Sequence, residues 1–164
     1  MKKALAVIFI AQIILLAMMT QMTAFGEDYE VYVICHPKSF VWARSKPKYG
    51  AEKIAYFDVG DEVLTDGKKM GKWLHVFPTC EAGEGWLYMG YVVYDEPIVY
   101  KDGMEATTTH KNVLARRNID GKINKKLKKN AELKIYVLTD EWAVTNLGFI
   151  KSKFLTWSGK NEFE

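Results

Sequence analysis

The sequence is poor in the residues that build reactive centres. Its 164 residues include two cysteines and three histidines, and they show no Cys-x-x-Cys or His-x-x-x-His spacing of the kind that binds zinc. The twelve glycines are spread over turns and form no phosphate-binding loop. A catalytic cysteine would need a free thiol and an oriented histidine, and we expect no further domain that builds a cleft around such a pair. We therefore predict no metal, no cofactor and no enzymatic activity.

The sequence also lacks helical patterning after its N-terminal segment. Beyond residue 26, no stretch keeps apolar residues at helical spacing for three turns. Short runs of alternating apolar and polar residues are instead separated by Gly, Pro and Asp, which is typical of β-strands joined by turns. We expect such a turn at residues 101–103, followed by a strand from residue 104 to residue 109. The chain is therefore predicted to be all-β apart from its start.

The first 26 residues have the pattern of a secretory signal peptide. Lys2 and Lys3 precede an apolar run from residue 4 to residue 19, and Ala24-Phe25-Gly26 gives a small-x-small cleavage pattern. The apolar run is short for a membrane span, which needs roughly 20 residues. An uncleaved anchor is the alternative, and it would be the chain's only contact with a membrane. We expect a secreted or periplasmic protein of the cell envelope.

Charge divides the remaining chain into two unlike halves. Residues 27–97 hold 8 basic and 12 acidic side chains, whereas residues 98–164 hold 13 basic and 8 acidic ones. Residues 95–97, Asp-Glu-Pro, form the best boundary between two units. Opposite net charges favour packing of the two units on each other, or contact of the basic unit with an anionic surface.

One sequence pattern occurs twice. The residues from Asp61 to Tyr88 contain three strand-like segments that recur, at the same order, between Ala131 and Lys151. Trp73 aligns with Trp142, and Gly85-Trp86 aligns with Gly148-Phe149. Upstream of both, Val-Trp-Ala-Arg at residues 41–44 aligns with Val-Leu-Ala-Arg at residues 113–116. An internal repeat of this kind predicts two small modules rather than one larger domain.

The ordered motif set resembles the bacterial SH3 domain family, SH3b. The resemblance covers nearly all of the chain after residue 26, with two departures. The family more often has Asn-Val-Arg at residues 41–44 and 113–116, and Phe149 stands where it usually has Trp. The resemblance implies two small SH3-like β-barrels in tandem, at residues 27–97 and 98–164. It also implies a role in recognising peptidoglycan cross-bridges or stem peptides.

Both cysteines, Cys35 and Cys80, fall in the first unit. Export to an oxidising compartment makes such a pair a candidate disulfide. The bridge would tie the long loop that precedes Trp86 to the first strand, while the second unit has only Asn146-Leu147 at the equivalent place. Two separate thiols are the alternative.

Aromatic side chains are the candidates for ligand binding. Most aromatic residues of a small barrel are core, since they supply its burial. We expect Trp42, Tyr49 and Tyr91 to form exposed walls of a groove, because the SH3 resemblance places ligands between the loop and turn that hold the last two. The residues at repeated strand positions are predicted to be core or groove floor; they are Trp73, Trp86, Trp142 and Phe149.

A basic run between residues 122 and 134 has two interpretations. It contains six lysines, which either form a solvated face of the second barrel or bind an anion. In an exported protein that anion would be a wall polymer or a lipid headgroup, and we expect no nucleic-acid partner.

Together these patterns predict an exported, non-catalytic binding protein. Its expected partner is a cell-wall peptide or glycan, bound in a shallow aromatic groove. The alternative is an adaptor or inhibitor module, in which the two units form one rigid body that docks on another envelope protein.

Overall fold

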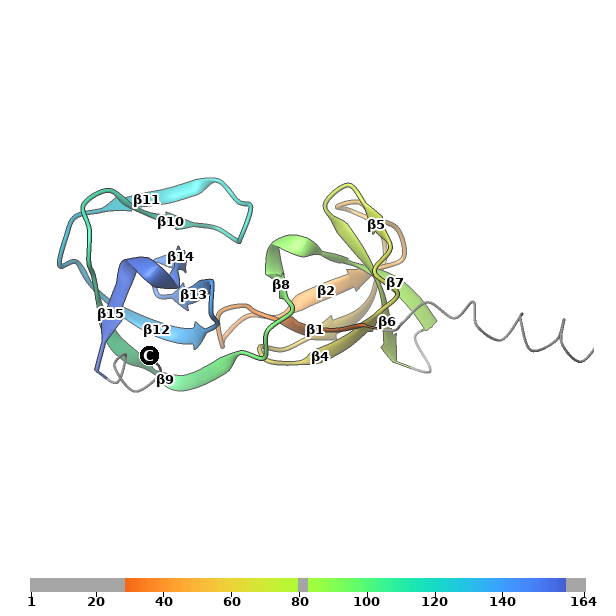
Figure 1. The fold of residues 1–164 in the computed structure, drawn as a ribbon. Coiled ribbons are helices and arrows are strands. Elements are labelled where there is room, and N and C mark those ends of the chain that lie inside the picture. The colour runs from red at the N-terminus through yellow and green to blue at the C-terminus, as the bar shows by residue number, and fades with distance from the viewer. Residues whose placement is uncertain (1–28, 80–82, 159–164) are drawn as a thin grey trace, which may run out of the picture.

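The computed structural model describes residues 29–79 and 83–158. Within these residues the structure is all-β, with two short 3₁₀ turns as its helical segments (Figure 1). None of the helical segments in the described part is long and apolar enough to cross a membrane. The predicted signal peptide, residues 1–26, lies outside the described residues.

The first sheet is antiparallel, with the strand order β3-β2-β7-β6-β4-β1-β8, and β5 pairs with β6 beside this path. Its elements are β1 (Tyr29–Val33), β2 (Val41–Arg44), β3 (Lys53–Phe57), β4 (Glu62–Thr65), β5 (Lys69–Met70), β6 (Trp73–Thr79), β7 (Gly83–Tyr88), the turn η1 (Met89–Tyr91) and β8 (Val92–Val93). We call this unit the first module.

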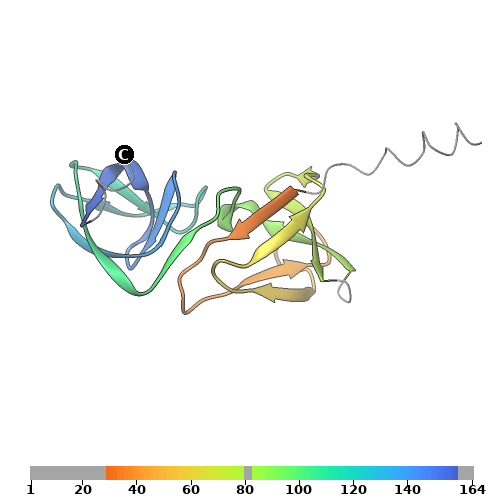
Figure 2. The same cartoon turned by 60° about the horizontal axis from the view of Figure 1, so that its bottom comes forward.

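The second sheet is also antiparallel, with the strand order β11-β10-β14-β13-β12-β9-β15. Its elements are β9 (Ile98–Thr108), β10 (Val113–Arg116), β11 (Ile123–Leu127), β12 (Glu132–Leu138), β13 (Trp142–Thr145), β14 (Gly148–Lys151), the turn η2 (Ser152–Phe154) and β15 (Leu155–Trp157). We call this unit the second module. Both sheets curve strongly (Figure 2), but no ladder between described strands joins β3 to β8 or β11 to β15. The structure therefore shows two open antiparallel sheets rather than closed barrels.

The two sheets agree in register as well as in strand order. In the hairpin β6–β7, Trp73 pairs with Tyr88, and in the hairpin β13–β14, Trp142 pairs with Lys151. A register shift also falls at the same place in both sheets, before Arg44 in β2 and before Arg116 in β10. Positions of one module can therefore be compared directly with those of the other.

Each module buries a core of its own, as alternation along its strands requires. In β6, Leu74 and Val76 point into the first core, while Trp73 and His75 point to the other face. The buried apolar residues at the centre of the first core are Val31, Val33, Ala43, Leu74, Val76 and Leu87. Those at the centre of the second core are Ala115, Leu133, Ile135, Ala143, Ile150 and Leu155.

Strand β9 corrects one sequence expectation. We predicted a turn at residues 101–103, but β9 runs without interruption from Ile98 to Thr108. The register shifts within it, since Met104 pairs with Ile135 and Val99 pairs with Val137. Gly103 has a φ of 75°, so its left-handed conformation serves a bulge inside a strand rather than a chain reversal. The boundary predicted after residue 97 falls between β8 and β9.

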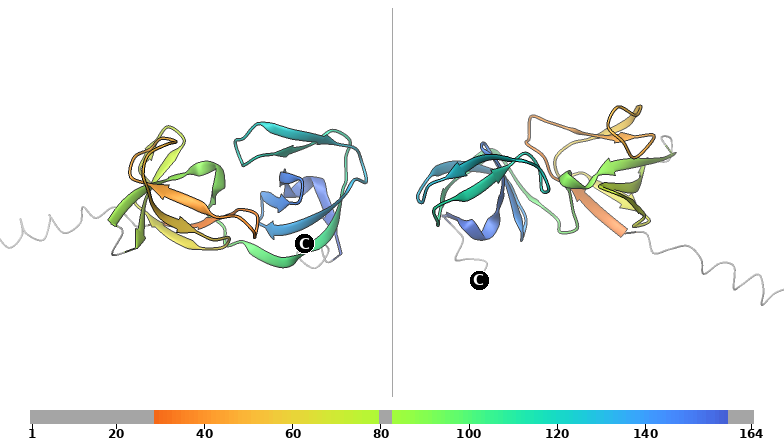
Figure 3. Two further views of the ribbon diagram at one scale, coloured as in Figure 1. Left: turned by 180° about the vertical axis from the view of Figure 1, so that it is seen from behind. Right: turned by 90° about the horizontal axis from the view of Figure 1, so that it is seen from above.

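A third apolar cluster lies between the modules. Ile34 and Val93 of the first module pack with the outer face of the second sheet, whose buried members are Val137, Trp142, Val144 and Phe149. A backbone hydrogen bond also joins the modules, because the Ile119 N–H donates to the Gly90 carbonyl over 3.0 Å. Figure 3 shows the two sheets side by side in views from behind and from above. The modules therefore pack on each other, as their opposite charges suggested.

Candidate ligand-binding grooves

A groove of about 400 Å³ opens on the first module beside the second. We call it the first groove. Its walls come from the turn after β1, from β2, from the loop before β3 and from the hairpin β6–β7, with η1 and two residues of the second module at one end. The lining residues are Cys35, His36, Ser39, Phe40, Val41, Trp42, Arg44, Tyr49, Trp73, Tyr88, Tyr91, Arg117 and Phe149.

Aromatic rings follow one another along the first groove. The Tyr49 ring lies 5.2 Å from Trp73 and 5.3 Å from Tyr88, and the Trp73 and Tyr88 rings are 5.6 Å apart. Tyr91 continues the series at 6.1 Å from Tyr88 and 5.8 Å from Phe149. Most of these pairs meet edge to face, the arrangement that aromatic rings favour. The rings thus form a continuous aromatic surface that crosses from the first module to the second.

The wall and floor positions differ in exposure. Tyr49, in the loop before β3, is 67% exposed, whereas Trp73 is 7% exposed and Phe149 4%. Trp42 and Tyr91 are half-buried. Trp73 points away from the first core because of strand alternation, and the rings of Tyr49 and Tyr88 cover it. The first groove therefore brings together five of the seven sequence-predicted groove residues, with an exposed aromatic side chain at its rim.

Hydrogen bonds fix the polar part of the first groove. The Arg44 guanidinium donates from Nη1 to the Ala51 carbonyl over 2.7 Å, which holds the loop that carries Tyr49 against β2. Partial burial, a hydrogen bond with Tyr88 and neighbouring hydroxyls raise the pKa of Tyr49 above its usual range. Tyr49 therefore stays neutral at physiological pH, and the groove offers ring surface and hydroxyl groups rather than negative charge.

Trp86 lies next to the first groove but does not line it. It shares the outer face of β7 with Tyr88, and its ring contacts His75 at 5.0 Å. His75 is buried, and its Nδ1 lies 3.0 Å from Asp66 Oδ2 while its Nε2 lies 3.2 Å from Glu84 Oε2. Partial burial raises the pKa of Asp66, but hydrogen bonds from Lys68 and His75 outweigh it and leave the pKa below its ordinary value. This polar cluster fills the outer face where the second module has Val144 and Phe149.

A small exposed aromatic cluster adjoins the rim of the first groove. Phe40 and Tyr56 are 54% and 61% exposed. Both contact Trp42 edge to face, with ring centroids 5.5 and 5.8 Å from it. Lys53 lies over the Trp42 ring at 4.6 Å. Trp42 therefore links the first groove to a surface of exposed rings.

The remaining predicted groove residue, Trp142, lines a separate cavity of about 660 Å³ on the second module. We call it the second groove. It occupies the position equivalent to the first groove, because β10, β13, β14 and η2 replace β2, β6, β7 and η1. Its lining residues are His110, Lys111, Asn112, Val113, Leu114, Arg116, Ile119, Asp120, Trp142, Lys151 and Phe154.

The structure describes one of the two cysteines. Cys35 is 3% exposed, and its thiol donates to the Ser39 carbonyl over 3.3 Å. Burial, with smaller contributions from the charges of Asp58 and Asp61, raises the pKa of Cys35 to about 11. A thiol of this kind is protonated at neutral pH and is a poor nucleophile. Cys80 lies outside the described residues, so the Cys35–Cys80 disulfide remains a prediction.

Among the described side chains, no group of three or more His, Cys, Asp and Glu residues could hold a metal ion. The predicted basic run, residues 122–134, begins just before β11, an edge strand whose residues from Ile123 to Lys126 are exposed, and continues through the following turn into β12. Its lysines lie outside both grooves.

Sequence reasoning missed Tyr88, Phe40 and Arg117 as groove residues. Tyr88 had a signal in the sequence, since alternation from Trp86 places it on the same face of β7. Arg117 had none, because it reaches the first groove only through packing of one module on the other. The second groove as a separate cavity was also missed, although Trp142 aligns with Trp73 in the repeat.

No protein-family model and no curated protein matches the chain. Solved structures that resemble it include two from Trichomonas vaginalis. The structure of NlpC1 is 14% identical with a TM-score of 0.36, and the alignment covers 83% of this chain and 48% of that one. The structure of NlpC2 is 12% identical with a TM-score of 0.35, covering 82% of this chain and 50% of that one. The chain thus spans about half the length of each.

Proposed function

We propose that this chain is an exported, non-catalytic binding protein made of two SH3b-like modules, and that its first groove recognises peptide or glycan of the cell wall. The observation that carries this proposal is the aromatic surface of the first groove, which extends from Tyr49 to Phe149. Aromatic rings give a large contact area at low entropic cost. An extended peptide can lie across such a surface, as peptides do in aromatic-lined SH3 grooves.

The second module completes the first groove, and its residues there indicate the kind of ligand that fits. Phe149 closes the aromatic series, and Arg117 supplies a positive charge at the same end of the groove. The tandem arrangement therefore builds one composite site in addition to any gain in avidity. A ligand with an apolar portion and an acidic group toward the second module fits this distribution of chemistry.

The non-catalytic part of the proposal is supported by the state of Cys35. This thiol lines the first groove, yet its raised pKa keeps it protonated at neutral pH. Its hydrogen bond to the Ser39 carbonyl also directs it away from a role as a nucleophile. Turnover of wall fragments by residues 27–164 would overturn this part of the proposal.

The test is sedimentation of residues 27–164 with insoluble peptidoglycan over a series of salt concentrations. We expect retention that survives added salt, because ring contacts are screened far less than charge contacts between exposed groups. Tyr49→Ala removes the exposed wall of the first groove and should reduce binding up to about tenfold, since one aromatic contact is worth about 0.5–1.5 kcal/mol beyond the area that it buries.

Tyr94→Ala is the matched control. Tyr94 is 58% exposed and lies outside both grooves, so its loss should leave retention unchanged. Retention that disappears in moderate salt, or an equal loss in the Tyr49→Ala and Tyr94→Ala variants, would contradict binding through the first groove.

The exposed cluster of Phe40, Trp42 and Tyr56 favours a second candidate function. Contiguous exposed rings are enriched at protein–protein contacts, and the packed modules present them on one rigid body. In this case the chain is an adaptor or inhibitor of another envelope protein. It would then ignore peptidoglycan and form a stoichiometric complex that Tyr56→Ala weakens and Tyr94→Ala does not.

A further inference from the structure

The second groove has a different chemistry from the first at equivalent positions. Lys151 pairs with Trp142 across the hairpin β13–β14, where the first module has Tyr88 opposite Trp73. Phe154 of η2 occupies the place of Tyr91 of η1. Both grooves therefore have a tryptophan at the floor, but the second groove has the ammonium group of Lys151 where the first has the phenol ring of Tyr88.

The lining of the second groove is positively charged. Lys111, Arg116 and Lys151 contribute cations, and Asp120 is the only carboxylate among the described lining residues. Apolar side chains, among them Val113 and Phe154, form the surface between these charges. A cavity of about 660 Å³ with this distribution accommodates a ligand of a few residues that has an apolar part and a negative group.

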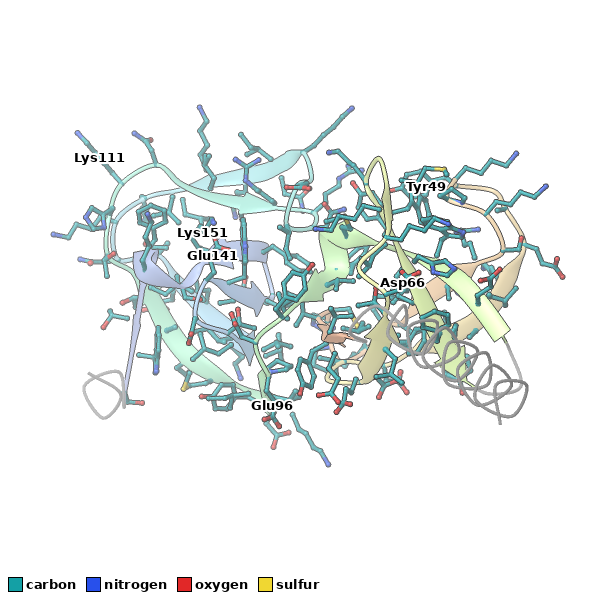
Figure 4. The ribbon with its side chains drawn as sticks, turned by 45° about the vertical axis from the view of Figure 1, so that its right-hand side comes forward. Tyr49, Asp66, Glu96, Lys111, Glu141 and Lys151 are labelled. Carbon is teal, nitrogen blue, oxygen red and sulfur yellow. The ribbon has the colours of Figure 1, made fainter. Side chains whose placement is uncertain are left out.

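Glu141 already places a carboxylate beside Lys151, one of the cations that line the second groove. It forms an ion pair with Lys151, whose Nζ also lies 4.3 Å from the centre of the Trp142 ring. Figure 4 shows Lys151 and Glu141 next to each other on the second module, with Lys111 toward its outer end. The Glu141 side chain is 65% exposed and that of Lys151 34%. An exposed ion pair of this kind is weak, so a ligand carboxylate can replace Glu141.

We propose that the second groove binds the carboxylate of a short peptide, with an apolar residue of that peptide against Trp142 and Phe154. Lys151, positioned by the Trp142 ring, pairs with the carboxylate, and Lys111 and Arg116 add to the positive potential. Glu141 competes with the ligand for Lys151. This site is independent of the proposed function of the first groove, because its charges and its floor come from the second module alone.

The experiment uses residues 27–164 and two probes, acetyl-Ala-Leu with a free carboxylate and the same dipeptide as its amide. The readout is the indole N–H signal of Trp142 in a two-dimensional NMR titration, identified by its loss in Trp142→Phe. We expect the acid to shift this signal saturably, and the amide to bind about tenfold more weakly, as for loss of one charge-assisted hydrogen bond. The indole signal of Trp73 reports separately on the first groove.

Three variants sharpen the test. Lys151→Gln should weaken binding of the acid about tenfold, and Glu141→Gln should strengthen it about threefold because it removes the competing carboxylate. Lys125→Gln makes the same change of charge on the exposed strand β11, outside the groove, and should have little effect. An unchanged Trp73 signal shows that the variants remain folded.

Several results would overturn the proposal. Equal binding of acid and amide would exclude carboxylate recognition, and an unshifted Trp142 signal would exclude the second groove. Inorganic phosphate that binds as tightly as the acid would show a general anion site without peptide recognition. Failure to sediment with peptidoglycan bears on the first groove alone and leaves this result standing.

Discussion

Equivalent residues of the two modules have acquired different surroundings. Trp73 is covered by tyrosines of its own module, whereas Trp142 is covered on one side by the first module and bordered on the other by Lys151. His75 and Val144 likewise occupy one position, and the first is paired with carboxylates while the second is buried in the inter-module cluster. At the residue scale, neighbours rather than the shared fold determine what each groove can bind.

Cys35 gives a prediction about pH at this scale. Its pKa in the folded state, about 11, lies above the ordinary value of 9.0, so the folded protein holds the proton more tightly than the unfolded chain. This contribution is fully present below pH 9 and is lost as the pH rises toward 11. Under reducing conditions, we expect the wild type to lose up to about 2–3 kcal/mol of stability over this range relative to Cys35→Ala.

Urea unfolding of both proteins at pH 8 and pH 11 measures this difference. Other groups that titrate at alkaline pH are common to the two proteins, so they cancel in the comparison. An equal pH dependence under reducing conditions would contradict a buried free thiol. If the difference appears only after reduction, the protein contains the disulfide predicted between Cys35 and Cys80.

At the scale of elements, the hairpin β13–β14 carries both the second groove and the junction between the modules. Its turn is short, and Gly148 at its end has a φ of 120°. A Cβ at this position would lie 2.4 Å from the Arg116 carbonyl oxygen, which belongs to the backbone of β10 and has little room to move. Close approach of β10 and β14 therefore depends on glycine at residue 148.

Gly148→Ala should cost about 3 kcal/mol or more, because steric overlap adds to the strain of a left-handed conformation. Gly50→Ala is the control, since Gly50 also has a positive φ, 85°, but no atom lies within 4 Å of a Cβ built there. It should cost about 1–2 kcal/mol. Urea unfolding at neutral pH measures both, and similar losses in the two variants would exclude close strand approach as the reason for Gly148.

Most strands were predictable from the sequence, but the larger arrangement was not. Alternation along β6 and the alignment of Trp73 with Trp142 indicated the strands of the hairpins β6–β7 and β13–β14, because both signals are local in the sequence. The turn expected at residues 101–103 was wrong since a positive-φ glycine looks the same in a turn and in a bulge. Val144 and Phe149 appear as ordinary core residues of a strand, and only the packed modules show that they form an interface.

At the scale of the molecule, the apolar cluster between the modules joins them into one packed unit. A module of about 70 residues buries a limited core, and the inter-module cluster adds fully buried side chains such as Ile34 and Val137 to both. The same contact positions Phe149 and Arg117 at the end of the first groove. Stability and the composite groove therefore depend on the same contact.

Ile34→Ala tests this dependence. Ile34 is fully buried and packs in the inter-module cluster, away from the core of the first module, so its truncation should cost about 2–4 kcal/mol, mainly from the contact between modules. Differential scanning calorimetry should then show two transitions where the wild type shows one.

Val31→Ala is the control for Ile34→Ala, because Val31 is equally buried but belongs to the core of the first module. It should lower the melting temperature while the transition stays single, since the module contact is intact. Ile34→Ala should also weaken binding at the first groove, because Phe149 and Arg117 are no longer held against it. A single transition in both variants, with unchanged binding, would contradict the dependence of the module contact and of the first groove on Ile34.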